Sequence, residues 1–299
     1  MIHIVDAGQF WQELAAGAAA IAVVVGYIAL LWRLVDRLTS CDDAEELWTK
    51  GNWAYFLQRI ALAGAQGLAM VSSVAPSSGH PWQDLGWLAL EGLWVLVLLL
   101  AVRWLVDLVV LRDVDNLQAL LAGNLAVGAV EAGFYLGVGA ILGGTLSGDA
   151  PSAGVGFAST AVFTVLGLGT LVGVYFLHEL LTPYDVREAI RRGSFAAGLE
   201  VGGALIAISI VVRMAVSGDF TGWGPDLLTF LLAVVVAIVA LYGFRWLIDR
   251  VVLTGRTTRS IQAGEEAVAS ATLAGLFVIA ALPVAAVVGA FVTSVVTVG

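Results

Sequence analysis

Residues 150–177 read APSAGVGFASTAVFTVLGLGTLVGVYFL, a run of 28 residues without Lys, Arg, Asp or Glu. A helix crosses the hydrocarbon core of a bilayer with about 20 mostly apolar residues, so this run is long enough to span a membrane. The whole 299-residue chain has the same character, because 60% of its residues are hydrophobic and 12% are charged. Soluble domains carry about 25% charged residues. We therefore expect an all-α, polytopic membrane helix bundle.

Further apolar runs lie on both sides of this one, and three of them contain ionisable residues. One cysteine and three scattered histidines give no basis for a disulfide or a metal site, and no cofactor motif is present, so we expect neither metal nor cofactor. Pro283 predicts a kink or an early end in the last run. The sequence predicts eight transmembrane helices near residues 12–37, 53–75, 85–111, 117–143, 155–181, 189–214, 226–252 and 262–296.

A glycine recurs at the start of every second predicted helix, with separations of 72, 70 and 71 residues. The four copies, each with the residue that follows it, are Gly51 and Asn52, Gly123 and Asn124, Gly193 and Ser194, and Gly264 and Glu265. Each repeat is therefore a two-helix hairpin. Because each repeat holds an even number of spans, all four enter the membrane with the same polarity and are parallel.

An acidic residue recurs near the end of each odd-numbered helix, three or four residues after an aromatic one. Arg33, Arg103 and Arg245 precede three of these acids at the spacing of a helical ion pair. Such charges anchor helices at the membrane interface, and the alternative is an ion-attracting vestibule. The interfacial acids are Asp36, Asp107, Glu179 and Asp249.

Basic residues gather in the loops that join odd to even helices, whereas loops 76–84 and 144–155 contain no Lys or Arg. The positive-inside rule places the basic loops in the cytoplasm and both termini outside. The basic loops also contain short polar residues expected to cap the even helices. These expected caps are Asp42, Asp113, Asp185 and Thr257.

The loop 182–185 (TPYD), the following segment 190–198 (IRRGSFAAG) and the pair Gly202–Gly203 stand in a characteristic order. This pattern resembles the bacterial inner-membrane family of unknown function typified by YjfL, whose members have four spans in two repeats. The resemblance implies two fused family units, residues 1–148 and 149–299, and a multi-pass location in the bacterial inner (plasma) membrane. It implies no biochemical activity.

Polar side chains recur at one depth in three even helices, seven or eight residues after the repeated glycine. This depth is about 10–12 Å, where an ionisable group is usually paired or faces water. If the even helices surround one axis, Arg59, Glu131 and Glu200 meet there with one uncompensated negative charge. The alternative is a structural ion pair. The predicted intramembrane polar site consists of Gln58, Arg59, Glu131 and Glu200.

These residues favour a conduit for a small solute, an ion or a proton that uses buried carboxylates. The alternative is a non-catalytic membrane scaffold that holds a partner through its basic loops. No metalloprotease, nucleophile-elbow or phosphate-loop motif occurs, so we do not expect an enzyme. The expected partners are the lipid bilayer and an unidentified membrane protein or second copy of the chain, with no nucleic acid.

Overall fold

The computed structural model describes residues 7–39, 41–74, 80–112, 114–182, 184–251 and 266–298. Within these residues every regular element is a helix, which confirms the all-α membrane bundle. Eight helices are long: α1 (Ala7–Leu38), α2 (Trp53–Met70), α3 (Pro81–Leu105), α5 (Leu125–Thr145), α6 (Ala153–Leu181), α8 (Phe195–Val216), α9 (Trp223–Val251) and α11 (Ala267–Val298). The short elements are η1 (Glu45–Thr49), η2 (Val71–Ser73), η3 (Val106–Val110), α4 (Asn116–Leu121) and α7 (Val186–Arg191).

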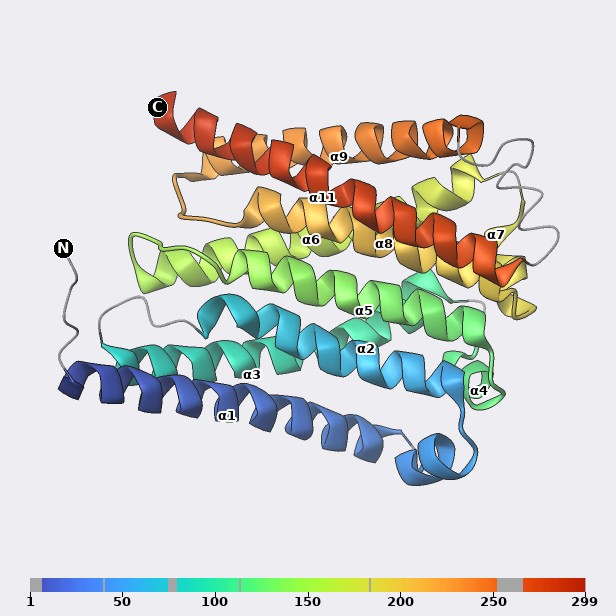
Figure 1. Cartoon of the computed structure of the whole chain (residues 1–299), viewed down its shortest axis with the longest axis horizontal. Coiled ribbons are helices and arrows are strands. Elements are labelled where there is room, and N and C mark those ends of the chain that lie inside the picture. The colour runs from blue at the N-terminus through green and yellow to red at the C-terminus, as the bar shows by residue number, and fades with distance from the viewer. Residues whose placement is uncertain are drawn as a thin grey trace.

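The long helices pair as α1 with α2, α3 with α5, α6 with α8, and α9 with α11. The second helices of these four hairpins all start at the end of the molecule where α4 and α7 lie, and they run in parallel (Figure 1). The first helices run in the opposite direction. The structure thus has four hairpins of one polarity, as the 70–72-residue glycine spacing predicts.

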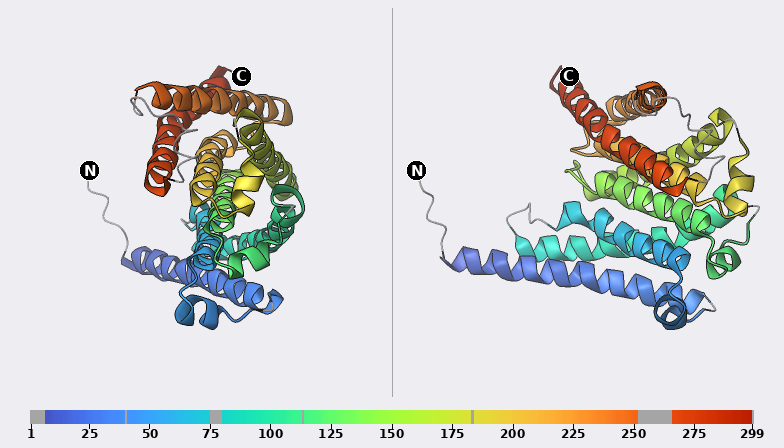
Figure 2. Two further views of the ribbon diagram at one scale, coloured as in Figure 1. Left: turned by 90° about the vertical axis from the view of Figure 1, so that its right-hand side faces the viewer. Right: turned by 45° about the vertical axis from the view of Figure 1, so that its right-hand side comes forward.

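The second helices form a row and do not surround an axis. Helix α2 packs against α5, α5 against α8, and α8 against α11. Helices α5 and α8 therefore lie between α2 and α11, and the first helices lie around the row (Figures 1 and 2). The expectation of a common axis is wrong because each central helix packs on opposite sides against two neighbours of its own kind.

Close packing within this row depends on glycine. A Cβ atom on Gly128 of α5 would lie 2.6 Å from the carbonyl oxygen of Ala54 in α2. A Cβ atom on Gly198 of α8 would lie 2.6 Å from Ala126 in α5. In lipid, helices associate through such close contacts, since no hydrophobic force joins them. The glycines therefore let the row form without intervening side chains.

Seven helices in the described part of the chain are long and apolar enough to cross a membrane, and α2 is not among them. Helix α2 has 18 residues and carries Gln58, Arg59 and Gln66, which reduce its hydropathy. All three polar side chains are buried. Seven of the eight predicted spans thus have a helix of this kind, and a membrane crossing by α2 stays a prediction.

The second helices start later than predicted in two repeats. Gly123 and Gly193 have φ angles of +80° and +85°, a conformation that L side chains rarely adopt. These glycines end the short helices α4 and α7, so α5 begins at Leu125 and α8 at Phe195. At the other end of the chain, α11 continues through Pro283 to Val298, and the expected early end there is wrong.

Candidate functional site

Glu131 is the most deeply buried carboxylate of the predicted polar site. It lies in α5 and is 1% exposed. The side-chain amide of Gln58, from α2, donates a hydrogen bond of 2.7 Å to Glu131 Oε2. The structure thus brings these two predicted site residues together across the interface between the first two repeats. The hydroxyl of Tyr135, in the same helix, is a second hydrogen-bond partner, so both partners of this carboxylate are neutral groups.

Arg59 has a different set of partners. Its guanidinium forms a 2.6 Å ion pair with Asp43 and donates hydrogen bonds to Thr39 and to the hydroxyl of Tyr55. Arg59 is 1% exposed. This cluster joins α2 to the segment that precedes it within the same repeat. Arg59 is therefore part of a structural ion pair.

Glu200 in α8 lies in a third cluster. It forms an ion pair with Arg245 of α9 and faces the Nε2 atom of His178 at 3.5 Å. The hydroxyl of Tyr184 donates a 2.9 Å hydrogen bond to Glu200 Oε2. A cavity of about 30 Å³ adjoins His178, Glu200 and Arg245. This volume is enough to hold a water molecule.

Arg59, Glu131 and Glu200 therefore do not share one centre, and this expectation is wrong. The physical reason is the row arrangement: Arg59 binds within its own repeat, whereas Glu200 binds a helix of the next repeat. Sequence reasoning missed Asp43 and Arg245 as partners. Arg245 was assigned to Asp249 because helical spacing alone cannot show that α9 turns this side chain towards α8.

The interfacial acids take partners from the segments that follow them. Asp107 accepts a 2.6 Å hydrogen bond from the amide of Asn116, and Glu179 forms a 3.0 Å ion pair with Arg187. Asp36 accepts a hydrogen bond of 3.4 Å from the backbone N–H of Asp43. These contacts fix the ends of the odd helices to the segments that follow them. The anchoring of these acids at the membrane interface stays a prediction. The side chain of Asp249 lies outside the described residues.

The polar residues after the repeated glycines cap the second helices. Asn124 Oδ1 accepts hydrogen bonds from the backbone N–H groups of Ala126 and Val127, while its amide donates to the carbonyl oxygen of Ile190 in the next repeat. Asn52 caps α2 in the same way by accepting from the backbone N–H of Ala54, and its amide donates a 2.8 Å hydrogen bond to the carbonyl oxygen of Leu120 in the next repeat. We call this double contact the asparagine clamp. Gly264 and Glu265 lie outside the described residues.

Ser194 occupies the third position and caps α8 through Ala197. The expected aspartate caps act elsewhere, since Asp185 caps α7 and Asp42 accepts hydrogen bonds at the start of the η1 segment. Asp113 and Thr257 lie outside the described residues. In the sequence, the repeated glycine marks the position of each clamp residue. A glycine with a positive φ angle ends one helix, and the capping residue of the next helix follows it directly.

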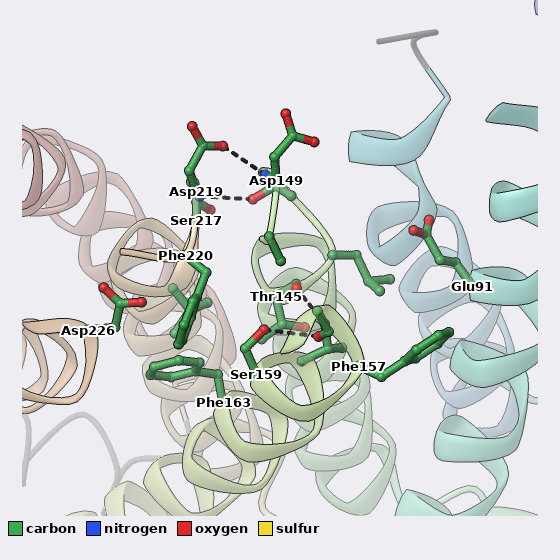
Figure 3. A pocket seen from close by; sticks show the side chains of 18 of the residues that line it. Glu91, Thr145, Asp149, Phe157, Ser159, Phe163, Ser217, Asp219, Phe220 and Asp226 are labelled. Atoms are coloured by element: carbon green, nitrogen blue, oxygen red, sulfur yellow. Dashed lines mark hydrogen bonds between the residues drawn. The ribbon is translucent and has the colours of Figure 1, made fainter. Parts of the chain in front are cut away.

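A larger cavity opens at the opposite end of the row, where α5 and α8 end and α6 and α9 begin (Figure 3). Its volume is about 390 Å³. Carboxylates of Glu91, Asp149, Asp219 and Asp226 line it together with aromatic rings and hydroxyl groups. Sequence reasoning noted only that loops at this end lack Lys and Arg, and it did not predict a cavity. In the described part of the chain no group of three or more His, Cys, Asp or Glu could hold a metal ion.

A family model described as Domain of Unknown Function (DUF350) matches the chain twice, over residues 9–146 and 152–288. These two matches cover most of the chain. The chain belongs to the DUF350 family. This membership confirms the resemblance to a fused pair of family units. The boundary between residues 148 and 149 stays a prediction.

A relative of this DUF350 protein is the UPF0719 transmembrane protein of Aquifex aeolicus (strain VF5), with 26% identity over 119 residues. The match covers 40% of this chain and 44% of the relative, so the chain spans less than half of the relative's length. No solved structure matches the chain. The family and the relative support a multi-pass membrane protein in contact with lipid.

Proposed function

We propose that the protein is a membrane conduit for small cations or protons and that Glu131 is the group that binds them inside the membrane. The observation that carries the proposal is the partner of Glu131. A structural carboxylate in a membrane usually pairs with a cation. Among the described residues, the hydrogen bonds to Glu131 come instead from two neutral groups, the amide of Gln58 and the hydroxyl of Tyr135. Arg103 attracts the carboxylate only at longer range and forms no ion pair with it.

A buried carboxylate that forms no ion pair is costly, on the order of 2.5–3.5 kcal/mol at a helix centre on insertion scales. Retaining such a group is understandable if it binds a proton or cation in transit. The row around it is tightly packed, because glycines bring α5 against α2 and α8. In the proposed conduit this packing corresponds to a closed state, and the helices separate to let the ion pass.

The proposal is tested in proteoliposomes that contain the purified full chain and a cation gradient. We expect flux above that of protein-free vesicles and a loss of at least about tenfold in Glu131→Gln, which corresponds to about 1.4 kcal/mol in the barrier. Glu45→Gln, an exposed acid in η1, is the matched control and should leave the flux unchanged. Equal flux in wild type and Glu131→Gln would refute the role of Glu131.

The second candidate is a non-catalytic membrane scaffold, and the free side of α11 favours it. Val268, Ile279 and Leu282 on α11 are more than half exposed, so the row ends in an apolar helix that another membrane protein or a second copy could cover. Crosslinking in native membranes separates the candidates. A crosslinked partner combined with zero flux in vesicles would favour the scaffold over the conduit.

We further propose the bacterial inner membrane as the location, with the loops of α4 and α7 in the cytoplasm and both termini outside. The excess of Lys and Arg in these loops supports this orientation. Cys41 is the only cysteine and lies at this end, so a membrane-impermeant maleimide should leave it unlabelled in intact cells. In a Cys41→Ser background, Gly224→Cys at the opposite end should be labelled. The reverse pattern would overturn the orientation.

A further inference from the structure

We propose that the cavity at the end of α5 and α8 opposite to α4 and α7 binds a small organic cation of the alkylammonium class. The cavity volume of about 390 Å³ lies in the range of small-molecule sites. Such sites combine apolar and aromatic walls with a few polar groups that fix orientation. The lining of this cavity has that composition.

The charge of the lining selects for a cation. Glu91, Asp149, Asp219 and Asp226 contribute carboxylates, and none of the described residues that line the cavity is Lys or Arg. The two loops that contribute to the lining, 144–155 and 217–222, also contain no Lys or Arg in the sequence. An anion would therefore meet only like charges in the side chains of the cavity.

The placement of the carboxylates favours an organic cation over a metal ion. Figure 3 shows Glu91 on one side of the cavity, Asp226 on the other, and the Asp149–Asp219 pair above, with Phe157 and Phe163 between them. The carboxylates thus surround the space and do not converge on one point. Aromatic faces attract ammonium groups, and recognition of quaternary ammonium by aromatic side chains is a known use of this attraction.

Glu91 is the acid whose role is not explained by local structure. Asp219 accepts a 2.8 Å hydrogen bond from the backbone N–H of Asp149, and Asp226 accepts from the backbone N–H of Thr221. These aspartates also order the loops. Glu91, in contrast, is partly buried, and its partner among the described residues is the neutral hydroxyl of Ser73. An ammonium group in the cavity would supply the missing positive charge.

Binding of a cation here is independent of the conduit. That this cation is also the transported solute rests on the function proposed above. The two claims separate experimentally, since the site predicts binding at equilibrium and the conduit predicts flux. Binding without flux would leave the site standing and remove only its link to transport.

The test uses choline as the probe and 3,3-dimethylbutanol as its neutral analogue of equal shape, with binding to the purified full chain measured by calorimetry. We expect choline to bind and the neutral analogue to bind at least about fivefold more weakly, the factor for about 1 kcal/mol. Glu91→Gln should weaken choline binding about fivefold, and Glu45→Gln at the opposite end should not.

A steric pair of variants keeps the test independent of Glu91. Gly156 of α6 lines the cavity. Gly154 lies two residues earlier, about half a helical turn away. It does not line the cavity and has open space at its Cβ position. Gly156→Leu should abolish choline binding, and Gly154→Leu should leave it intact. Equal binding of choline and its neutral analogue would show an apolar pocket only and overturn the proposal. Choline binding that survives both Glu91→Gln and Gly156→Leu would also overturn it.

Discussion

Glu131 and Glu200 lie at similar depths in the neighbouring helices α5 and α8, but their surroundings differ. Glu200 is paired with Arg245 and faces His178, whereas Glu131 is hydrogen-bonded by the amide of Gln58. The repeats thus preserve the backbone arrangement while the partners of the buried acid change. In the function proposed above, Glu200 mainly holds helices together, whereas Glu131 is the acid that binds an ion or proton.

The largest expected effect on stability separates these two acids directly. Replacing Glu200 by Ala leaves the guanidinium of Arg245 without its carboxylate, which should cost about 3–5 kcal/mol. Glu131→Gln keeps a hydrogen-bonding group for Gln58 and should cost less than about 1 kcal/mol. Thermal unfolding in detergent, followed by circular dichroism, measures both. Equal losses in the two variants would remove the distinction.

A smaller effect on stability is expected at the contact between α2 and α5, where the helices pack closely through a glycine. Gly128→Ala places a Cβ atom 2.6 Å from the backbone oxygen of Ala54, so the helices must shift. Overpacking of this kind should cost about 1–3 kcal/mol. Gly169→Ala in α6 is the control, because its Cβ position is open, and it should be neutral or slightly stabilising. A neutral Gly128→Ala would show that the α2–α5 contact is looser than described.

The asparagine clamp gives a graded prediction. Asn124→Ala removes both the cap of α5 and the contact with Ile190 and should cost about 1–2 kcal/mol of unfolding free energy. Asn124→Ser should cost less, because serine retains the cap as Ser194 does in the next repeat. The same unfolding assay ranks the three proteins. If serine and alanine were equally destabilising, the inter-repeat contact and not the cap would be the main contribution.

Most of the architecture could be predicted from the sequence, because apolar runs and repeated glycines determine helices and hairpin polarity. The predicted starts of α5 and α8 were too early, because hydropathy does not show that the φ angles of Gly123 and Gly193 are positive and break the helix there. The partners of Arg59 and Glu200 could not be predicted either. They depend on which faces of α2, α8 and α9 meet, and nothing in helical spacing decides between a row and a ring.

The smallest expected effect is the pH dependence of stability that Glu46, in η1, contributes. Hydrogen bonds from Lys50 and Asn52 hold the pKa of Glu46 below its usual range. A carboxyl whose pKa is lowered in the folded state contributes stability at neutral pH, and this contribution is lost as the pH falls through the lowered value. We expect Glu46→Gln to be slightly less stable than wild type at about pH 7, and this difference to shrink as the pH falls below about 4, the usual range of a glutamate pKa. A difference that is constant with pH would contradict this.

The carboxylate of Glu131 is the centre of this account, and the comparison of Glu131→Asp with Glu131→Gln in proteoliposomes tests it most directly. Both variants remain polar, but only the aspartate retains an ionisable group. We predict that cation or proton flux persists in Glu131→Asp and is lost in Glu131→Gln. Equal flux in the two variants would show that the charge at this position does not take part in conduction.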